Sequence, residues 1–239
     1  MIYISKIMLH TLEQAKKNAG IYAADFVKSG MTIGIGTGST VYWFIQELSN
    51  RVKQGLEIAA VPTSSRTSEL CLQAGIKIAD LNSVSNLPLT IDGADEIDAQ
   101  GQLIKGGGGA LLQEKIVAAA SSQLIIIADK SKLVAQLGKF PLPVEVIPFG
   151  YKKVQEKIIS SGLCKTVILR QNDHEPFVTD HGHYILDCGF EKIDDAFAMN
   201  SVLHLIPGVV ETGLFINMAT KAVIAFDNGR IEIINYKDQ

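Results

Sequence analysis

The chain has 239 residues, of which 47% are hydrophobic and 20% are charged, and its net charge is −3. A chain of this length and composition can bury one large core or two modest ones. It has no basic stripe interleaved with aromatic residues, so we do not expect nucleic acid as a partner. Its longest aliphatic run, at 124–128, is far below the roughly 20 residues that span a bilayer, which argues against a membrane role.

Three cysteines, Cys71, Cys164 and Cys188, lie far apart and outside any metal-ligand spacing. They predict buried apolar thiols in a reducing compartment. The opening segment 1–10 contains Lys6 and lacks the sustained apolar region and cleavage site of a secretion signal. We therefore expect a cytoplasmic protein that holds no metal.

Helices and strands are predicted to alternate through the first 128 residues. Thr11 and Gln14 form a capping box that predicts the start of a helix, which runs to about Phe26 and closes near Gly30. Strands are then predicted at 31–36, 58–61, 76–79, 89–91 and 124–128, and helices at 41–48, 65–74 and 110–120. This alternation favours a parallel sheet covered on both faces, whose ligands bind beyond the carboxyl ends of the strands.

The pattern changes after the two prolines of segment 140–143. A strand at 144–147 and a helix at 154–159 precede a strand-rich stretch at 166–188, with a turn at 172–173 and a hairpin signal at 180–182, and a helix follows near 194–205. These elements predict a small α+β unit. Segments 214–216, 223–226 and 231–234, with a turn at 227–229, predict a strand and a hairpin that can return to the first sheet.

The glycine-rich segment GIGTGST, at 34–40, lies between a predicted strand and a predicted helix. Backbone N–H groups at such a junction favour an anion, so the segment predicts a phosphate site. A dinucleotide fingerprint fails because Ser39 stands where glycine is required and no acid follows the next strand, and a P-loop fails because no Gly-Lys-Ser/Thr follows. A tight turn without a ligand is the alternative.

Two further segments place polar groups after predicted strands. The acidic run DGADEID, at 92–98, predicts carboxylates beside the phosphate loop; a solvated acidic turn and a divalent cation site are the alternatives. The segment KGGGGALLQEK, at 105–115, places four glycines before a helix, which indicates close approach to a ligand rather than a flexible linker. Glu114 lies about one turn into that helix, where a surface glutamate is the alternative.

Charged residues elsewhere carry weaker signals. Lys130 and Lys132 follow the strand at 124–128 and are expected at the ligand edge, although a solvated position is the usual one for a lysine. His174, His181 and His183 have no metal-ligand spacing and are expected at the surface.

Together with ADKSKLV at 128–134, GKFPLPVEVIP at 138–148 and PGVVETGLF at 207–215, these motifs closely resemble type A ribose-5-phosphate isomerase. The resemblance runs in order through most of the chain and implies an α/β fold, with a Rossmann-like, mostly parallel catalytic domain (1–140 plus 214–239) and a smaller ferredoxin-like α+β domain (141–213). It also implies no cofactor, a homodimer or homotetramer, and the interconversion of D-ribose 5-phosphate and D-ribulose 5-phosphate in the non-oxidative pentose phosphate pathway. About nine residues precede Thr11 beyond the family's usual start, so Met8 is an alternative initiator to Met1.

The same resemblance implies the site residues. Glu114 is the expected general base, with Asp92, Asp95 and Lys105 as polar partners of the sugar. The expected substrate-binding residues are Thr37, Gly38, Ser39, Thr40, Asp92, Gly93, Ala94, Asp95, Lys105, Gly106, Gly107, Gly108 and Lys132. A sugar-phosphate sensor, a coenzyme A transferase and a sugar-phosphate deaminase are the alternatives; a sensor of the transcription-regulator type would need a DNA-reading module, which the segment before the first helix is too short to hold.

Overall fold

The computed structural model describes residues 2–236, with side chains from Thr11 onward; Met1, one of the two candidate initiators, lies outside the described residues. Contacts within the chain divide it into two compact units. Unit 1 contains Met1–Gly93, Ile116–Lys132 and Ala219–Gln239, and unit 2 contains Ala94–Lys115 and Leu133–Met218. The domain limits implied by the family resemblance remain a proposal.

Unit 1 is built on a seven-stranded sheet with the strand order β16-β15-β7-β4-β1-β2-β3. All neighbouring strands are parallel except the hairpin of β15 and β16. The strands are β1 (Thr32–Ile35), β2 (Ala59–Pro62), β3 (Lys77–Ile78), β4 (Thr90–Asp92), β7 (Leu124–Asp129), β15 (Ala219–Ala225) and β16 (Ile231–Asn235). The interior strand β7 is buried along its whole length, as expected for a strand covered on both faces.

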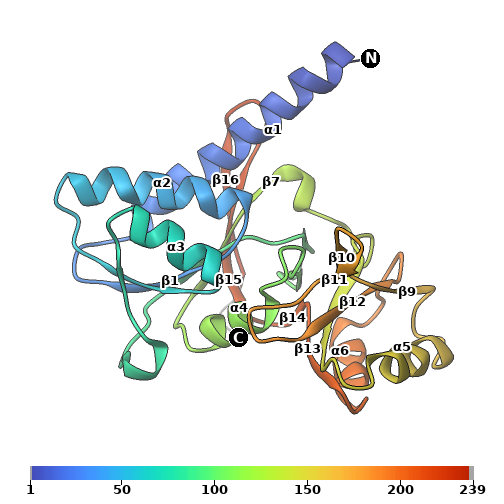
Figure 1. Cartoon of the computed structure of the whole chain (residues 1–239). Helices are drawn as coiled ribbons and strands as arrows, with labels where there is room; N and C mark the ends of the chain where they lie inside the picture. Colours follow the sequence, from blue (N-terminus) through green and yellow to red (C-terminus); the bar gives the residue numbers. More distant parts are fainter. Residues whose placement is uncertain (1, 237–239) are drawn as a thin grey trace. The chain divides into compact units, whose positions relative to one another are not determined.

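Helices cover both faces of this sheet. The helices α1 (Ile2–Ala23), α2 (Ser39–Lys53) and α3 (Ser65–Gln73) share one core with alternate strand residues such as Ile33, Ile35 and Ala60, and Figure 1 shows these helices together. Val61 points to the opposite face from Ala60. There it packs with Leu87 and with Val117, which belongs to α4 (Leu111–Ala119). The first half of α4 belongs to unit 2 and its second half to unit 1. Short 3-10 turns lie at Ala24–Phe26, Leu81–Ser83 and Lys130–Lys132.

Unit 2 contains a four-stranded antiparallel sheet with the order β13-β8-β12-β9. Its strands are β8 (Leu142–Val146), β9 (Thr166–Leu169), β12 (Tyr184–Gly189) and β13 (Val209–Thr212), and their shared core includes residues of α5 (Tyr151–Ser160) and α6 (Ala196–His204). A three-stranded sheet is formed by β5 (Glu96–Ile97), β6 (Leu103–Ile104) and β14 (Leu214–Phe215). A hairpin is formed by β10 (Gln171–Asn172) and β11 (Glu175–Pro176).

The predicted fold class is confirmed: the protein is α/β with a mostly parallel central sheet and smaller antiparallel sheets. Two local predictions are wrong. Thr11 does not begin the first helix, because α1 already starts at Ile2. The strand at 214–216 does not join the large sheet but pairs with β6.

Candidate active site

Three predicted site segments of unit 1 lie at one edge of its sheet. The strands β7, β4 and β1 are neighbours in the sheet and run in the same direction. Their carboxyl ends lead into Lys130–Lys132, Asp92 and Thr37–Thr40, respectively. The parallel register therefore places these three segments at the same edge, as the sequence predicts.

The glycine-rich loop ends at the start of α2. Gly38 is the N-cap, with φ of 139°, a left-handed conformation that favours glycine, and it has no side chain with which to cap the first helical amides. Gly38 and Ser39 are exposed, whereas Thr40 is buried. Exposed amides and hydroxyls at a helix N-terminus suit an anion.

Thr37 instead stabilises the loop itself. Its N–H donates to Oδ1 of the fully buried Asp92 at 3.1 Å, and the Gly93 N–H donates to the same oxygen at 2.7 Å. Its hydroxyl lies within 2.8–3.0 Å of the hydroxyls of Thr63, Ser64 and Thr67. The hydroxyl network joins the loop after β1 to the start of α3, and the two N–H groups fix the orientation of the Asp92 carboxylate.

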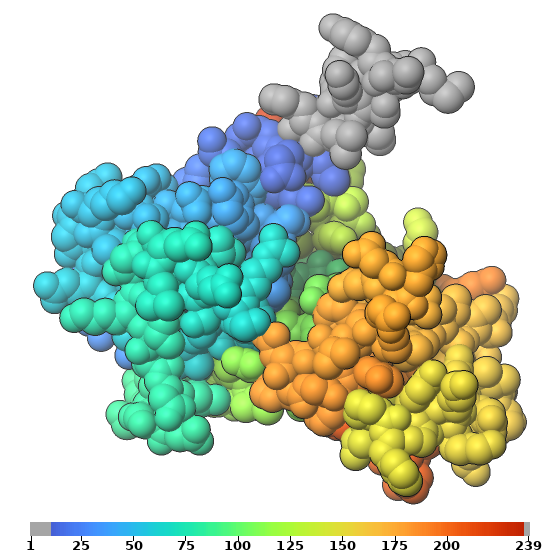
Figure 2. Space-filling model, viewed as in Figure 1, coloured from blue at the N-terminus to red at the C-terminus, as the bar shows by residue number. Residues whose placement is uncertain are grey.

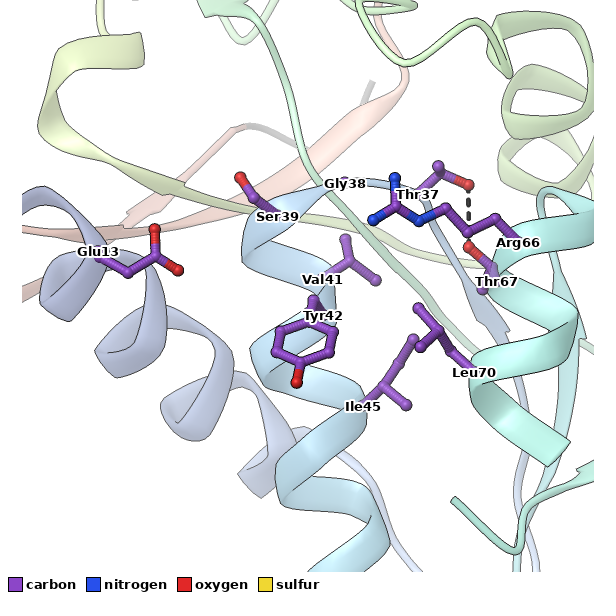
Figure 3. Close-up of a pocket in the computed structure, with 10 residues that line it drawn as sticks. All are labelled: Glu13, Thr37, Gly38, Ser39, Val41, Tyr42, Ile45, Arg66, Thr67 and Leu70. Carbon is purple, nitrogen blue, oxygen red and sulfur yellow. Dashed lines mark hydrogen bonds between the residues drawn. The ribbon is translucent and has the colours of Figure 1, made fainter. Parts of the chain in front are cut away.

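A pocket of about 270 Å³ opens beside this loop within unit 1. Figure 3 shows the side chain of Arg66 extending from α3 toward Gly38 and Thr37, while Tyr42, Ile45 and Leu70 form an apolar wall. Sequence reasoning missed Arg66. The available signal was a basic residue in the first turn of the helix that follows β2.

In unit 2, Lys105 and Glu114 form a buried ion pair. Lys105 follows β6 and Glu114 lies in the first turn of α4, and their Nζ and Oε2 atoms are 3.1 Å apart. The Lys105 and Glu114 side chains are only 2% and 4% exposed, respectively. Desolvating a lone charge is costly, so each charge depends on the other and on its hydrogen-bond partners. The surface position considered for Glu114 is thus wrong.

The glycine loop between these two residues binds a second carboxylate. The Gly107 N–H donates to Asp95 Oδ2 at 2.8 Å, and the Gly109 N–H donates to the Gly106 carbonyl at 3.0 Å, closing a tight turn before α4. Gly106 has φ of 100°, and a Cβ on it would lie 2.9 Å from Leu111 Cδ2. Gly107 and Gly108 are exposed, and their backbone is accessible to a ligand.

The remaining acids of segment 92–98 have structural roles. Glu96 is buried and accepts from the N–H groups of Gly138 and Phe140 at 2.7 and 2.6 Å. Asp98 accepts from the N–H groups of Gln100 and Gln102, both at 2.9 Å, and burial raises the pKa of its carboxyl group. Only Asp92 and Asp95 therefore remain as candidate sugar partners in this run.

The aromatic ring of Phe215 lies near two lysines. Lys105 Nζ lies 5.2 Å and Lys115 Nζ 4.9 Å from the ring centroid, within cation–π range. Burial lowers the pKa of Lys115, and Glu211, 2.7 Å away, opposes that shift. Because Lys115 is held by Glu211 and by the Thr212 carbonyl, it is a structural neighbour of Glu114 rather than a second cation free for the substrate.

Comparison with known proteins identifies the family. The sequence model of ribose 5-phosphate isomerase A (phosphoriboisomerase A) matches residues 59–229. The chain is 57% identical to ribose-5-phosphate isomerase A of Bacillus cereus over 219 residues, which cover 91% of this chain and 99% of that protein. The chain belongs to the ribose 5-phosphate isomerase A family.

Solved structures agree with this assignment. The ribose 5-phosphate isomerase of Plasmodium falciparum has a TM-score of 0.91 and 40% identity, covering 95% of this chain and 100% of that one. A D-ribose-5-phosphate isomerase in complex with phospho-erythronic acid has a TM-score of 0.90 and 37% identity, covering 94% of this chain and 99% of that one. The predicted resemblance to the isomerase family is therefore confirmed.

Two findings concern partners of other kinds. Among residues 11–236, whose side chains the structure describes, no group of three His, Cys, Asp or Glu is arranged to hold a metal ion. No helix within residues 2–236 is long and apolar enough to cross a membrane. Of the histidines predicted at the surface, His183 is only partly exposed, and its Nδ1 lies 3.0 Å from the buried Glu145.

Proposed function

We propose that this protein interconverts D-ribose 5-phosphate and D-ribulose 5-phosphate in the non-oxidative pentose phosphate pathway. The buried Lys105–Glu114 pair carries the proposal, because it places a carboxylate base beside a cation 3.1 Å away in a water-poor setting. The isomerisation requires that combination. A proton leaves C2 of the open-chain aldose, an enediolate forms, the hydroxyl proton passes from the C2 oxygen to the C1 oxygen, and the proton taken from C2 is returned to C1.

Glu114 is the proposed general base. Its carboxylate accepts the C2 proton and delivers it to C1 on the same face of the enediolate, so one group performs both transfers. Its position in the first turn of α4 is set by the tight glycine turn that precedes it. A rigid base within reach of its proton contributes through orientation as well as basicity.

Lys105 is the proposed electrostatic partner of the enediolate. When the C2–H bond breaks, its electron pair stays on the sugar and is delocalised onto the C1 oxygen, and a fixed ammonium group stabilises the resulting negative charge. Once Glu114 takes up the proton and becomes neutral, the positive charge of Lys105 is available to the enediolate. The exposed backbone of Gly107 and Gly108 provides further donors.

The two aspartates have separate proposed roles. Asp92 assists ring opening by moving a proton between the ring oxygen and the C1 hydroxyl, and Asp95 positions a sugar hydroxyl by accepting its hydrogen bond. Backbone N–H groups hold both side chains: Thr37 and Gly93 for Asp92, and Gly107 for Asp95. Carboxylates near a developing anion need such fixed acceptor roles, because otherwise they repel it.

The proposed substrate contacts follow the family motifs. Thr37 to Thr40, with the open N-terminus of α2, bind the anionic part of the substrate, and Lys132 adds a cation after β7. The backbone at Gly93, Ala94 and Gly106 to Gly108 contacts the sugar. Thr37 contributes mainly through the loop it holds, since its hydroxyl already contacts Thr63, Ser64 and Thr67.

We further propose a cytoplasmic homodimer or homotetramer that needs neither cofactor nor nucleic acid. We keep as a proposal the division into a catalytic domain, 1–140 plus 214–239, and a small domain, 141–213.

The function is tested by incubating the purified protein, dialysed against EDTA, with ribose 5-phosphate and measuring ketose formation. We expect turnover in the presence of chelator, because Lys105 and backbone donors meet the enediolate charge. Activity that disappears and returns with Mg²⁺ or Mn²⁺ would assign a metal role to the aspartates. Absence of ketose under both conditions would favour a coenzyme A transferase, a deaminase or a sensor.

A further inference from the structure

Arg170 of unit 2 contacts the glycine loop but lies outside the sequence segments that make up the proposed site. It follows β9 directly and precedes the β10–β11 hairpin. Its Nε and Nη2 donate to the two oxygens of Asp187, at 2.9 and 2.5 Å, in a two-pronged ion pair. Its Nη1 donates to the carbonyls of Gly106 and Gly107, at 2.8 and 3.2 Å.

One peptide group therefore connects Arg170 to Asp95. The Gly106 carbonyl and the Gly107 N–H belong to the same peptide unit, which is trans, because no described peptide bond is cis. Its carbonyl accepts from Arg170 at 2.8 Å and its N–H donates to Asp95 Oδ2 at 2.8 Å. A cation at the carbonyl end polarises the peptide and strengthens the N–H as a donor.

The ring of Phe177 packs against both the glycine loop and the Arg170 guanidinium. A Cβ on Gly109 would lie 2.5 Å from Phe177 Cε1 and closer still to its Cζ, so the ring lies directly against the loop. The Arg170 guanidinium lies 5.9 Å from the centroid of that ring, and the Phe177 N–H donates to the Arg170 carbonyl at 2.9 Å. Figure 2 shows the segment of the β10–β11 hairpin, in orange, on the molecular surface.

Burial and charge make this contact stronger than an ordinary surface pair. The Arg170 side chain is 14% exposed, and its guanidinium matches the Asp187 carboxylate in the planar geometry that fixes an arginine most firmly. The loop it holds has little stabilisation of its own, since four successive glycines lose much backbone entropy when ordered. A rigid external donor therefore offsets part of that loss.

We propose that Arg170, oriented by Asp187, is a positioning residue for the isomerisation. It holds the Gly106–Gly107 peptide so that the Gly107 N–H stays on Asp95 and the loop keeps its course into α4 and Glu114. The inference rests on the proposed function, and Arg170 acts through the loop without touching the substrate.

The test compares Arg170→Met with Arg51→Met in the full chain. Arg51 is a matched control in unit 1, because it also pairs with two carboxylates, Asp25 and Glu47, and donates to a backbone carbonyl, that of Ala24, at 2.8 Å. For Arg170→Met we expect kcat per folded chain to fall about 10- to 100-fold, the range for a misplaced active-site loop, with KM for ribose 5-phosphate changed by less than about threefold. Arg51→Met should keep kcat within about twofold of the native value, since it lies outside the proposed machinery.

Two further readouts separate positioning from a merely structural role. Arg170→Lys keeps the charge but cannot form the planar fork, so its kcat should lie between those of the native protein and Arg170→Met. Methylguanidinium added to Arg170→Ala should raise kcat at least severalfold, with no such rise for Arg51→Ala. Circular dichroism at the assay temperature gives the folded fraction for each variant.

The possible outcomes are distinct. A native protein that makes no ketose from ribose 5-phosphate defeats the proposed function. A native protein that is active, together with an Arg170→Met variant of unchanged kcat per folded chain, overturns the positioning role alone. Loss that is fully explained by the unfolded fraction, or methylguanidinium without effect on Arg170→Ala, also overturns it.

Discussion

Replacing Gly36 by alanine should displace the Asp92 carboxylate. A Cβ on Gly36 would lie 2.6 Å from Asp92 Cβ and closer still to its Cγ and Oδ1. The backbone of Gly36 does not have a positive φ, so alanine causes no backbone strain there. The expected effect therefore comes from the collision between the new Cβ and Asp92. Asp92 is fully buried and cannot rotate into solvent.

The cost follows from the contacts that must yield. Overpacking a tight interior costs roughly 1–3 kcal/mol. If the Asp92 carboxylate gives up a backbone donor, either Thr37 at 3.1 Å or Gly93 at 2.7 Å, about 1.5–3 kcal/mol more is lost, the usual value for a hydrogen bond to a charged group. The free energy of unfolding should therefore fall by roughly 2.5–6 kcal/mol.

Urea denaturation of native protein, Gly36→Ala, Gly93→Ala and the double variant Gly36→Ala/Asp92→Gly measures this effect. A Cβ on Gly93 would meet only the Thr37 carbonyl oxygen, at 3.9 Å, so that substitution should change the free energy by less than about 1 kcal/mol. The double variant removes the obstructing side chain and should recover about 1–3 kcal/mol relative to additivity. A Gly36→Ala protein as stable as the native one would refute the reasoning.

The other predictions concern the thiols and the anion-binding loop. In native protein at pH 8, iodoacetamide should modify Cys164 first, because a hydrogen bond with Cys188 lowers the pKa of Cys164. The same bond and burial raise the pKa of Cys188, and burial raises the pKa of Cys71 to about 12. Peptide mass spectrometry that finds Cys71 labelled before urea is added would contradict the burial of that thiol. Ser39→Asp should raise KM for ribose 5-phosphate at least about tenfold through like-charge repulsion while stabilising the start of α2, and the effect should shrink with unphosphorylated ribose; an equal loss with both sugars would count against an anion site.

The large sheet was predictable because its strands are buried on both faces. Continuous apolar runs such as 124–128 identify β7, and the glycines and acids that follow the strands identify the edge where ligands bind. The predicted helices were also found, with boundaries shifted by up to five residues, the largest shift being at the end of α2, except at the start of α1. There the capping box at Thr11 competes with a helix that is already formed, since segment 2–10 contains neither glycine nor proline to interrupt it.

The smaller antiparallel sheets were harder to predict. The strands β5 and β6 have two residues each, which is too short to establish a period of two. The strand at 214–216 was predicted, but its pairing with β6 was not, because β6 itself had no signal. Strand β13 also escaped prediction, because its apolar residues are two consecutive valines followed by Glu211 rather than an alternating series.

Single polar side chains that act across the fold leave no local pattern. Arg170 meets Gly106 across 64 positions of sequence, and Arg66 is one basic residue in an ordinary helix start. The Lys105–Glu114 pair differs only in that its two members frame a run of glycines, which the sequence does display. Partner choice over long separations depends on the folded topology, so only the structure reveals it.

The central claim is that the Glu114 carboxylate moves the proton at C2. The most direct measurement follows exchange of the C2 hydrogen of ribose 5-phosphate with D₂O by NMR, together with ketose formation, in native protein and in Glu114→Gln. That variant keeps the size and hydrogen-bonding capacity of the side chain, so substrate binding should persist. Turnover and exchange should fall in parallel, by about 10²- to 10⁴-fold or more. Near-native rates of both in Glu114→Gln would contradict the account and direct the search for the base to Asp92 first and Asp95 second.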